Sequence, residues 1–176
     1  EAEAIVSEIS IRLKNSIETG AEESIGVVTF NSEQQRLIED LLDIERRNNA
    51  DLEQFFSEDL LEPVFVKNLE SVQGDERDIM LFSIAYGPDM SGRVTMDFGP
   101  LTRQGGERRL NVAVTRARRE LLVFATLHPH QIDLSRTHSI GVRDLKHFLE
   151  FAQHGPRAIA EAIYGSIGDY DSPFEI

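Results

Sequence analysis

The sequence predicts an α/β domain built on a mainly parallel sheet. Short apolar runs rich in β-branched residues alternate with stretches of helical periodicity, and this order of elements is typical of parallel sheets. Residues 24–30, Ser-Ile-Gly-Val-Val-Thr-Phe, show the pattern well, because a strand buried on both faces does not alternate polar and apolar residues. In such sheets ligands bind beyond the carboxyl ends of the strands, so we expect the polar clusters that follow or flank strands to form the site.

Two helices are predicted on either side of this first strand in the sequence. Residues 1–17 have the periodicity of an amphipathic helix, with Gly20 just past its end. Asn31 has the character of an N-cap, with Gln34 three residues on. The apolar residues expected on the buried faces of the two helices are Ile5, Ile9, Leu13 and Ile17 in the first, and Leu37, Ile38, Leu41 and Leu42 in the second.

The rest of the chain continues the alternation of helices and strands. In order, we predict strands at 64–66 and 79–86 around a polar turn at 73–78, a loop at 87–106, a helix at 107–118, a strand at 121–125, a polar loop at 128–140 and a helix at 142–153. A change of character after Leu127 divides the chain into a core domain, residues 1–127, and a C-terminal extension or linker, residues 128–176.

The composition is that of an ordinary folded domain, with 176 residues of which 40% are apolar and 28% charged. No apolar run has the length of a membrane span, and the lack of cysteine excludes disulfides, thiol catalysis and cysteine-based zinc sites. The five histidines show no metal-binding spacing, so we expect no metal site, and the lack of cysteine fits the reducing cytoplasm, where we expect the protein. The chain begins within a predicted helix and without Met, so we expect it to be part of a longer protein.

The charge is unevenly distributed. A net charge of -13 disfavours a broad basic surface for nucleic acid. One short segment, however, contains many arginines and a single acid, Glu107: Arg103, Arg108, Arg109, Arg116, Arg118 and Arg119. This segment predicts a local anion site, with a solvated helix face as the alternative.

In the predicted helix 107–118, the apolar face would consist of Leu110, Ala113, Val114 and Ala117. Arg109 and Arg116, seven residues apart, would lie above one another at its flank, and Arg118 would point to the opposite side. A guanidinium fork binds phosphate oxygens well, so Arg109 and Arg116 are candidate phosphate ligands. Pairing with carboxylates such as Glu76 or Asp78 is an equally open interpretation.

The polar turn 73–78, Gln-Gly-Asp-Glu-Arg-Asp, contains the second group of candidates. Gly74 permits close approach of a ligand, and its N–H can donate to a phosphate oxygen. Glu76 can accept a hydrogen bond from a ribose hydroxyl. Asp75 and Glu76 are similar to a magnesium-binding acidic pair, but such a pair normally ends an apolar strand, so we disfavour magnesium here. A plain polar β-turn is the alternative.

Taken together, three segments resemble motifs of superfamily 1 helicases. Residues 26–34 resemble motif IV, the Gln73-Gly74-x-Glu76-x-Asp78 turn resembles motif V, and residues 107–118 are similar to motif VI of the Upf-like branch. The three occur in family order over roughly residues 1–127. The resemblance implies the second motor domain of such a helicase, with a RecA-like three-layer fold.

The resemblance also implies roles for individual residues. Arg116 corresponds to the arginine finger, which reaches the γ-phosphate across the cleft between two motor domains. The motif V residues Gln73, Gly74 and Glu76 are implied to bind ATP near the γ-phosphate and the ribose, and Arg109 to contact phosphate or the other domain. Thr29 and Asn68 are implied to face the nucleic-acid backbone. Asn68 replaces the usual Thr or Ser, and Phe30-Asn31 replaces a frequent Pro-Tyr.

The sequence lacks a phosphate-cradling P-loop, which needs Gly-Lys before Ser or Thr. The lysines are Lys14, Lys67 and Lys146, and none of them follows glycine. The resemblance therefore implies half of an ATPase motor, inactive alone, that shares ATP and Mg²⁺ with an N-terminal RecA-like domain. It also implies single-stranded nucleic acid as a partner, DNA before RNA. The alternatives are a non-catalytic RecA-like interaction module in a repair or defence assembly, and a small-molecule-binding α/β domain unrelated to helicases.

The end of the chain carries one more resemblance. Residues 171–175, Asp-Ser-Pro-Phe-Glu, are similar to the junction at which a nuclease-like domain begins in some helicase relatives. We therefore expect such a domain downstream.

Overall fold

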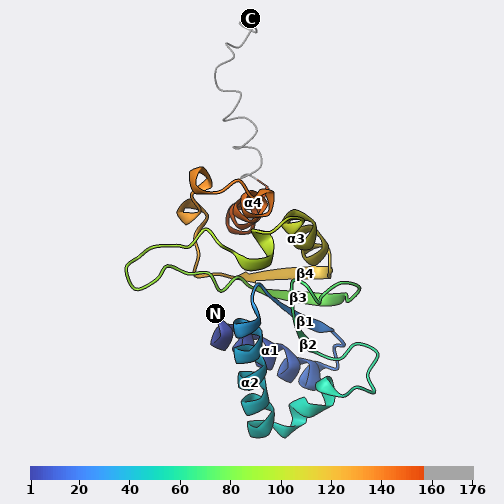
Figure 1. The fold of residues 1–176 in the computed structure, drawn as a ribbon. Helices are drawn as coiled ribbons and strands as arrows, with labels where there is room; N and C mark the ends of the chain where they lie inside the picture. The colour runs from blue at the N-terminus through green and yellow to red at the C-terminus, as the bar shows by residue number, and fades with distance from the viewer. Residues whose placement is uncertain (157–176) are drawn as a thin grey trace, which may run out of the picture.

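The computed structural model describes residues 1–156 and has an all-parallel sheet between two layers of helices (Figure 1). The sheet has four strands in the order β2-β1-β3-β4. Their bounds are β1 (Ile25–Thr29), β2 (Phe65–Asn68), β3 (Arg77–Ser83) and β4 (Ala117–Phe124). This arrangement confirms the predicted α/β class with its parallel sheet.

Two helices cover each face of the sheet (Figure 1). One face carries α1 (Ala2–Thr19) and α2 (Ser32–Asn48), and the other carries α3 (Gly106–Val114) and α4 (Ile140–His154). The remaining helical pieces are short 3₁₀ turns: η1 (Ala50–Phe56), η2 (Gly99–Leu101), η3 (Pro129–Gln131) and η4 (Leu134–Arg136). None of the helices in residues 1–156 is both long and apolar enough to cross a membrane.

The sheet separates two apolar cores, and its central strands contribute to both. In β3, Ile79 and Leu81 pack with α1 and α2, whereas Met80 and Phe82 pack with α3 and α4. All four side chains are at most 1% exposed. Successive side chains of a strand point to opposite faces, so a strand covered on both sides needs an unbroken apolar run. This burial explains the pattern from which the strands were predicted.

The first helix has the predicted position but a narrower buried face. Ile5, Ile9 and Leu13 are at most 1% exposed, whereas Ile17 is 45% exposed, contrary to the prediction. Residues four apart in a helix turn by roughly 40° relative to one another, so the fourth member of the series has rotated away from the core. Gly20 ends the helix in the left-handed conformation, with φ of 72°, and donates its N–H to the Ser16 carbonyl.

The second helix begins as predicted. The side chain of Asn31 accepts a hydrogen bond from the backbone N–H of Gln34 at 2.8 Å. Ile38 and Leu42 are buried, but Leu37 is 48% exposed, so its predicted burial was wrong. Leu41 is partly buried and packs against the same core, so Leu37 is the member of the predicted face that is exposed.

The third helix is shorter than predicted, which corrects the placement of two arginines. It ends at Val114, and β4 begins at Ala117, so Arg116 and Arg118 do not lie on a helix. The carbonyl of Arg116 accepts a hydrogen bond from the backbone N–H of Arg77 at 3.1 Å, and Ala117 pairs with Arg77 in the sheet. Sheet pairing thus overrides a helical pattern that the sequence continues to residue 117.

The chain after residue 127 packs on the same core as α3. Val142, Leu145 and Leu149 of α4 are buried there, and the helix matches the predicted one at 142–153. Ser139 caps it and donates its hydroxyl to the Leu101 carbonyl at 2.9 Å. The division of the chain at residue 127 remains a prediction, and the Asp-Ser-Pro-Phe-Glu segment, 171–175, lies outside the described residues.

Candidate functional site

The site forms where the chain enters β3 and β4, two neighbouring parallel strands. Glu76 directly precedes β3, and Arg116 lies just before β4. The Nη1 atom of Arg116 donates to Oε1 of Glu76 at 3.1 Å. Residues that precede parallel strands lie at the amino ends of the sheet, so the expectation of a site at the carboxyl ends was wrong for this pair. The structure does unite the arginine segment with the polar turn.

Arg116 is held by the end of α3 as well as by Glu76. Its Nε donates to the Val112 carbonyl at 2.9 Å, and its Nη2 donates to the Thr115 hydroxyl at 3.1 Å. The side chain of Arg116 is 21% exposed, and that of Glu76 is 49% exposed. The guanidinium therefore lies at the surface, outside both apolar cores, in an ion pair whose carboxylate is open to solvent. The structure thus contains the ion pair between Arg116 and Glu76, which the sequence offered as the alternative to phosphate binding.

The turn before β3 is open. Gly74 has φ of 93°, a left-handed conformation that side chains rarely adopt, and a Cβ there would meet no atom within 4 Å. Its backbone conformation, not lack of space, therefore favours glycine. Asp75 pairs with Lys67 at 2.6 Å, while Glu76 pairs with Arg116. The two neighbouring carboxylates are thus directed to different cations.

Arg109 lies apart from this pair. It is near the beginning of α3, and its Nη1 donates to the carbonyl of Gln104 at 3.1 Å and, more weakly, to that of Pro100 at 3.4 Å. Arg116 lies two residues beyond the other end of the same helix. The predicted alignment of Arg109 above Arg116 was therefore wrong, because the helix ends before Arg116.

Thr29 and Asn68 lie at the opposite end of the sheet. They are paired residues at the carboxyl ends of β1 and β2. Thr29 is completely buried, and its hydroxyl donates to the Asn31 carbonyl at 2.9 Å. Asn68 donates its side-chain N–H to Oε1 of Gln35 at 3.1 Å, and its Oδ1 caps the turn that follows β2. The structure brings these two residues together but places them away from Arg116.

Comparison with known proteins agrees with the fold and with the motif order. A family model described as an AAA domain matches residues 1–128. The chain belongs to this family, the C-terminal RecA-like domain of Upf-like superfamily 1 helicases.

Two curated relatives of this AAA domain come from Mycoplasma. The uncharacterized ATP-dependent helicase MG140 of Mycoplasma genitalium is 39% identical over 134 residues, which is 74% of this chain and 11% of the relative. The MG140 homolog of Mycoplasma pneumoniae is 37% identical over 136 residues, 75% of this chain and 12% of the relative. The chain thus spans about a tenth of the length of these proteins.

Among solved structures, the C-terminal domain of a possible DNA helicase from Lactobacillus plantarum WCFS1 is similar at 15% identity. The alignment covers 84% of this chain and 76% of that chain, with a TM-score of 0.42. The family assignment does not depend on this similarity.

One cluster of the AAA domain was not foreseen from the sequence. Arg118 donates Nη1 and Nη2 to the two carboxylate oxygens of Glu62, each at 2.6 Å, and Nε to Oδ1 of Asp78 at 3.1 Å. Its Nη2 also donates to the Ser24 hydroxyl at 2.9 Å. These hydrogen bonds from Arg118 hold the pKa of Glu62 at about 2. Glu62 lies 56 residues away in an irregular acidic segment, so spacing gave no sign of this partner.

A second unforeseen contact ties the carboxyl ends of β3 and β4. The Glu1 carboxylate accepts hydrogen bonds from the Ser83 hydroxyl at 2.9 Å and the Ala85 N–H at 2.8 Å. It also accepts from the N–H and the hydroxyl of Thr126 at 2.8 and 3.0 Å. Charged acceptors make the stronger hydrogen bonds in proteins, so Glu1 fastens the start of α1 to the sheet.

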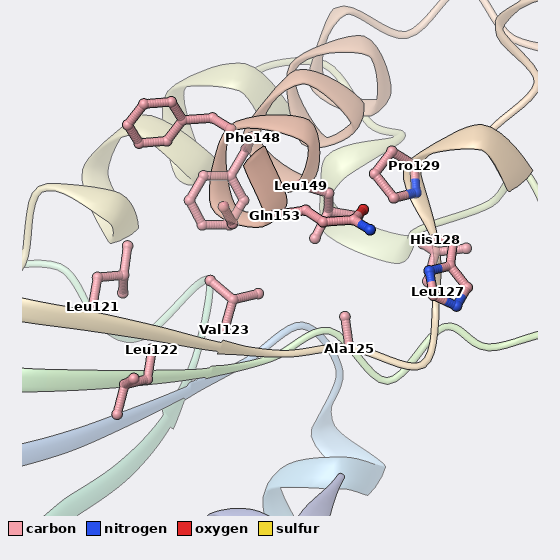
Figure 2. A pocket seen from close by; sticks show the side chains of 12 residues that line it. Leu121, Leu122, Val123, Ala125, Leu127, His128, Pro129, Phe148, Leu149 and Gln153 are labelled. Atoms are coloured by element: carbon pink, nitrogen blue, oxygen red, sulfur yellow. The ribbon is translucent and has the colours of Figure 1, made fainter. Parts of the chain in front are cut away.

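The AAA domain also has an apolar cavity between β4 and α4, which contains none of the candidate site residues (Figure 2). It measures about 560 Å³. Figure 2 shows Leu121 and Val123 of the strand facing Phe148 and Leu149 of the helix, with His128 at one side. The lining lacks the convergent polar groups that orient a reacting substrate, so we place the site at the amino ends of β3 and β4 instead.

Proposed function

We propose that the chain is half of the ATP-hydrolysing motor of a superfamily 1 nucleic-acid helicase and that Arg116 is its arginine finger. One observation carries the proposal: the Arg116 guanidinium lies at the surface beside Glu76, next to an open glycine turn. The Mycoplasma relatives are named as ATP-dependent helicases, which supports the same activity in the longer protein.

The chemistry suits the residue types of this site. Phosphoryl transfer depends on stabilising negative charge on the transferred group, and an arginine finger supplies about 10³–10⁵ in rate. That factor corresponds to roughly 4–7 kcal/mol of barrier. An exposed ion pair is worth about 0–1 kcal/mol, so exchanging Glu76 for a phosphate oxygen costs Arg116 little.

In this proposal the other side chains of the turn bind the nucleotide. Once Arg116 has turned to phosphate, Glu76 accepts a hydrogen bond from a ribose hydroxyl, and the Gly74 N–H and the Gln73 side chain donate to phosphate oxygens. Arg109 contacts the partner domain or phosphate from the other end of α3. The N-terminal RecA-like domain supplies the P-loop, which needs a Gly-Lys pair that is absent from this sequence, and the carboxylate for Mg²⁺.

The nucleic-acid strand is proposed to bind at the carboxyl ends of β1 and β2. Asn68 is partly exposed there, and the buried Thr29 supports the turn that follows β1. With a net charge of -13, the chain alone should bind single strands weakly and with steep salt dependence. We propose DNA before RNA as the substrate, and a nuclease-like domain downstream of the chain.

The test is Arg116→Ala in the full-length protein, with Arg119→Ala as the matched control. Arg119 is an arginine of the same segment, but its side chain is 62% exposed and pairs with Glu23. We expect Arg116→Ala to lower kcat for ATP hydrolysis by about 10³-fold or more and to leave the melting temperature unchanged. Arg119→Ala should keep wild-type kcat. Wild-type ATPase activity in Arg116→Ala would contradict the assignment of Arg116 as the arginine finger, whereas absence of ATPase activity in the wild-type full-length protein would favour the non-catalytic interaction module.

A further inference from the structure

Two arginine–carboxylate pairs follow one another where β3 and β4 begin. Glu76 pairs with Arg116 and Asp78 pairs with Arg118, each at 3.1 Å. The two acids are two residues apart on one chain segment, and the two arginines are two residues apart on the other. Between the two pairs, the Arg77 N–H donates to the Arg116 carbonyl at 3.1 Å. The position of the first pair therefore depends on the strand pairing at the second.

The second pair joins more separate segments of the chain than the first, although both arginines direct all three nitrogens to protein partners. Arg118 directs all three of its nitrogens to protein partners: Glu62 through a bidentate contact, Asp78, and the Ser24 hydroxyl. These partners come from the residues just before β1 and β2 and from β3 itself, while Arg118 belongs to β4. One guanidinium thus joins the beginnings of all four strands of the sheet. The lowered pKa of Glu62 agrees with the strength of this contact.

The strand pairing is irregular at this point. Arg77 pairs with Ala117, but Ile79 pairs with Glu120, so one extra residue of β4 lies opposite Asp78. Such bulges bend a strand and change the direction of its side chains, and they are frequent next to active sites. Arg118 lies in this bulge. Its contacts with Asp78, Glu62 and Ser24 stabilise the strand pairing at this irregular point.

We propose that Arg118 is a positioning residue for ATP hydrolysis. It anchors the start of β4, so that Arg116 stays beside Glu76 within reach of the nucleotide, and Arg118 does not itself bind phosphate. This inference rests on the proposed function of Arg116. The inference predicts that Glu62 matters for catalysis as much as Arg118 does. In the sequence, Glu62 lies near neither Gly74 nor the end of α3.

The experiment compares Arg118→Gln, Glu62→Gln and the double variant of the full-length protein, with Arg119→Gln as control. Each single variant should lower kcat for ATP by roughly ten- to a hundredfold, because small misplacements of a catalytic group are costly. KM for ATP should stay within about twofold, and the double variant should be no slower than the singles, because both changes break one network. Arg118→Lys should recover part of the activity, since it keeps the charge but not the fork.

Hydrogen exchange of the Arg77 amide in the same proteins gives a readout independent of activity. It should quicken in Arg118→Gln and Glu62→Gln and stay unchanged in Arg119→Gln, because Arg77 donates to Arg116. Unchanged exchange at Arg77, or a loss of kcat in Arg118→Gln that Glu62→Gln does not reproduce, would overturn the inference. Failure of the proposed function would be seen separately, as wild-type ATPase in Arg116→Ala with exchange at Arg77 still sensitive to Glu62.

Discussion

The two ends of the sheet use polar side chains differently. At the amino ends, arginines from β4 and the residue before it bind carboxylates, and the first of these, Glu76, is 49% exposed. At the carboxyl ends, Thr29 is completely buried, and the Glu1 carboxylate accepts hydrogen bonds from Ser83, the last residue of β3, and from Ala85 and Thr126, which lie just beyond β3 and β4. The Glu76–Arg116 pair at the amino ends can therefore be exchanged for a ligand at small cost, whereas the contacts of Thr29 and Glu1 at the carboxyl ends hold the fold.

The largest effect on stability is expected from Glu1. Glu1→Ala removes a charged acceptor and leaves the buried Ser83 hydroxyl and the Ala85 N–H without it, so the free energy of unfolding should fall by about 2–3 kcal/mol. Urea unfolding of the chain measures this change. Glu3→Gln, at an exposed acid two residues further along in the first turn of α1, is the control and should change stability by less than about 0.5 kcal/mol. Equal, small effects of the two substitutions would show that the carboxyl ends are not fastened in this way.

Substitution of Glu76 is expected to affect ATP binding much more than stability. Glu76→Gln removes only an exposed ion pair, so stability should change by less than about 1 kcal/mol. In the full-length protein KM for ATP should rise by about tenfold, since a neutral acceptor binds a ribose hydroxyl less strongly. Steady-state ATPase kinetics measure KM, and Glu70→Gln, another exposed acid, serves as control. An unchanged KM would place the ribose elsewhere.

The smallest effect is a dependence on pH. The pKa of Glu62 is about 2 in the folded chain against 4.5 for a free glutamate. A lowered carboxyl pKa stabilises the fold above the unfolded value, and this contribution is lost as pH falls from about 4.5 to about 2. The Arg118–Glu62 contact is partly exposed, so wild type should exceed Glu62→Gln by only about 1 kcal/mol near neutrality.

Urea unfolding of wild type and Glu62→Gln, first near neutral pH and then at progressively lower pH, measures how the difference in their free energies of unfolding depends on pH. The difference between wild type and Glu62→Gln should shrink as pH falls. A difference that stays constant across this range would mean that the Glu62 charge contributes nothing to the anchored pair.

The sequence predicted the elements that depend on local chemistry. The cap at Asn31, the stop at Gly20 and the first buried strand follow from side-chain hydrogen bonding, backbone freedom and an apolar run, and each is where it was expected. The end of α3 was misplaced because residue 117 fits the helical pattern, while its pairing with Arg77 in the sheet is set by a strand 40 residues away. Local periodicity contains no information about that pairing.

The same distinction holds for the site. Glu76 and Arg116 could be named from their motifs, and their contact follows from two neighbouring strands. Arg118 was recognised only as pointing away, because its partners Glu62 and Ser24 lie in segments without a pattern of their own. The exposure of a polar side chain also depends on tertiary packing, which local sequence does not reveal. Thr29 was therefore expected to face a ligand, but it is completely buried.

The most direct test of the central claim is the binding of ADP with aluminium fluoride, a mimic of the transferred phosphoryl group, to full-length wild type and Arg116→Ala. Groups that act in the transition state bind its analogues much more tightly than they bind ground-state ligands. Both proteins should bind ADP alone equally, and the variant should bind the aluminium fluoride complex at least about a hundredfold more weakly. Equal binding of that complex by the two proteins would contradict the assignment of Arg116 to the transferred phosphate.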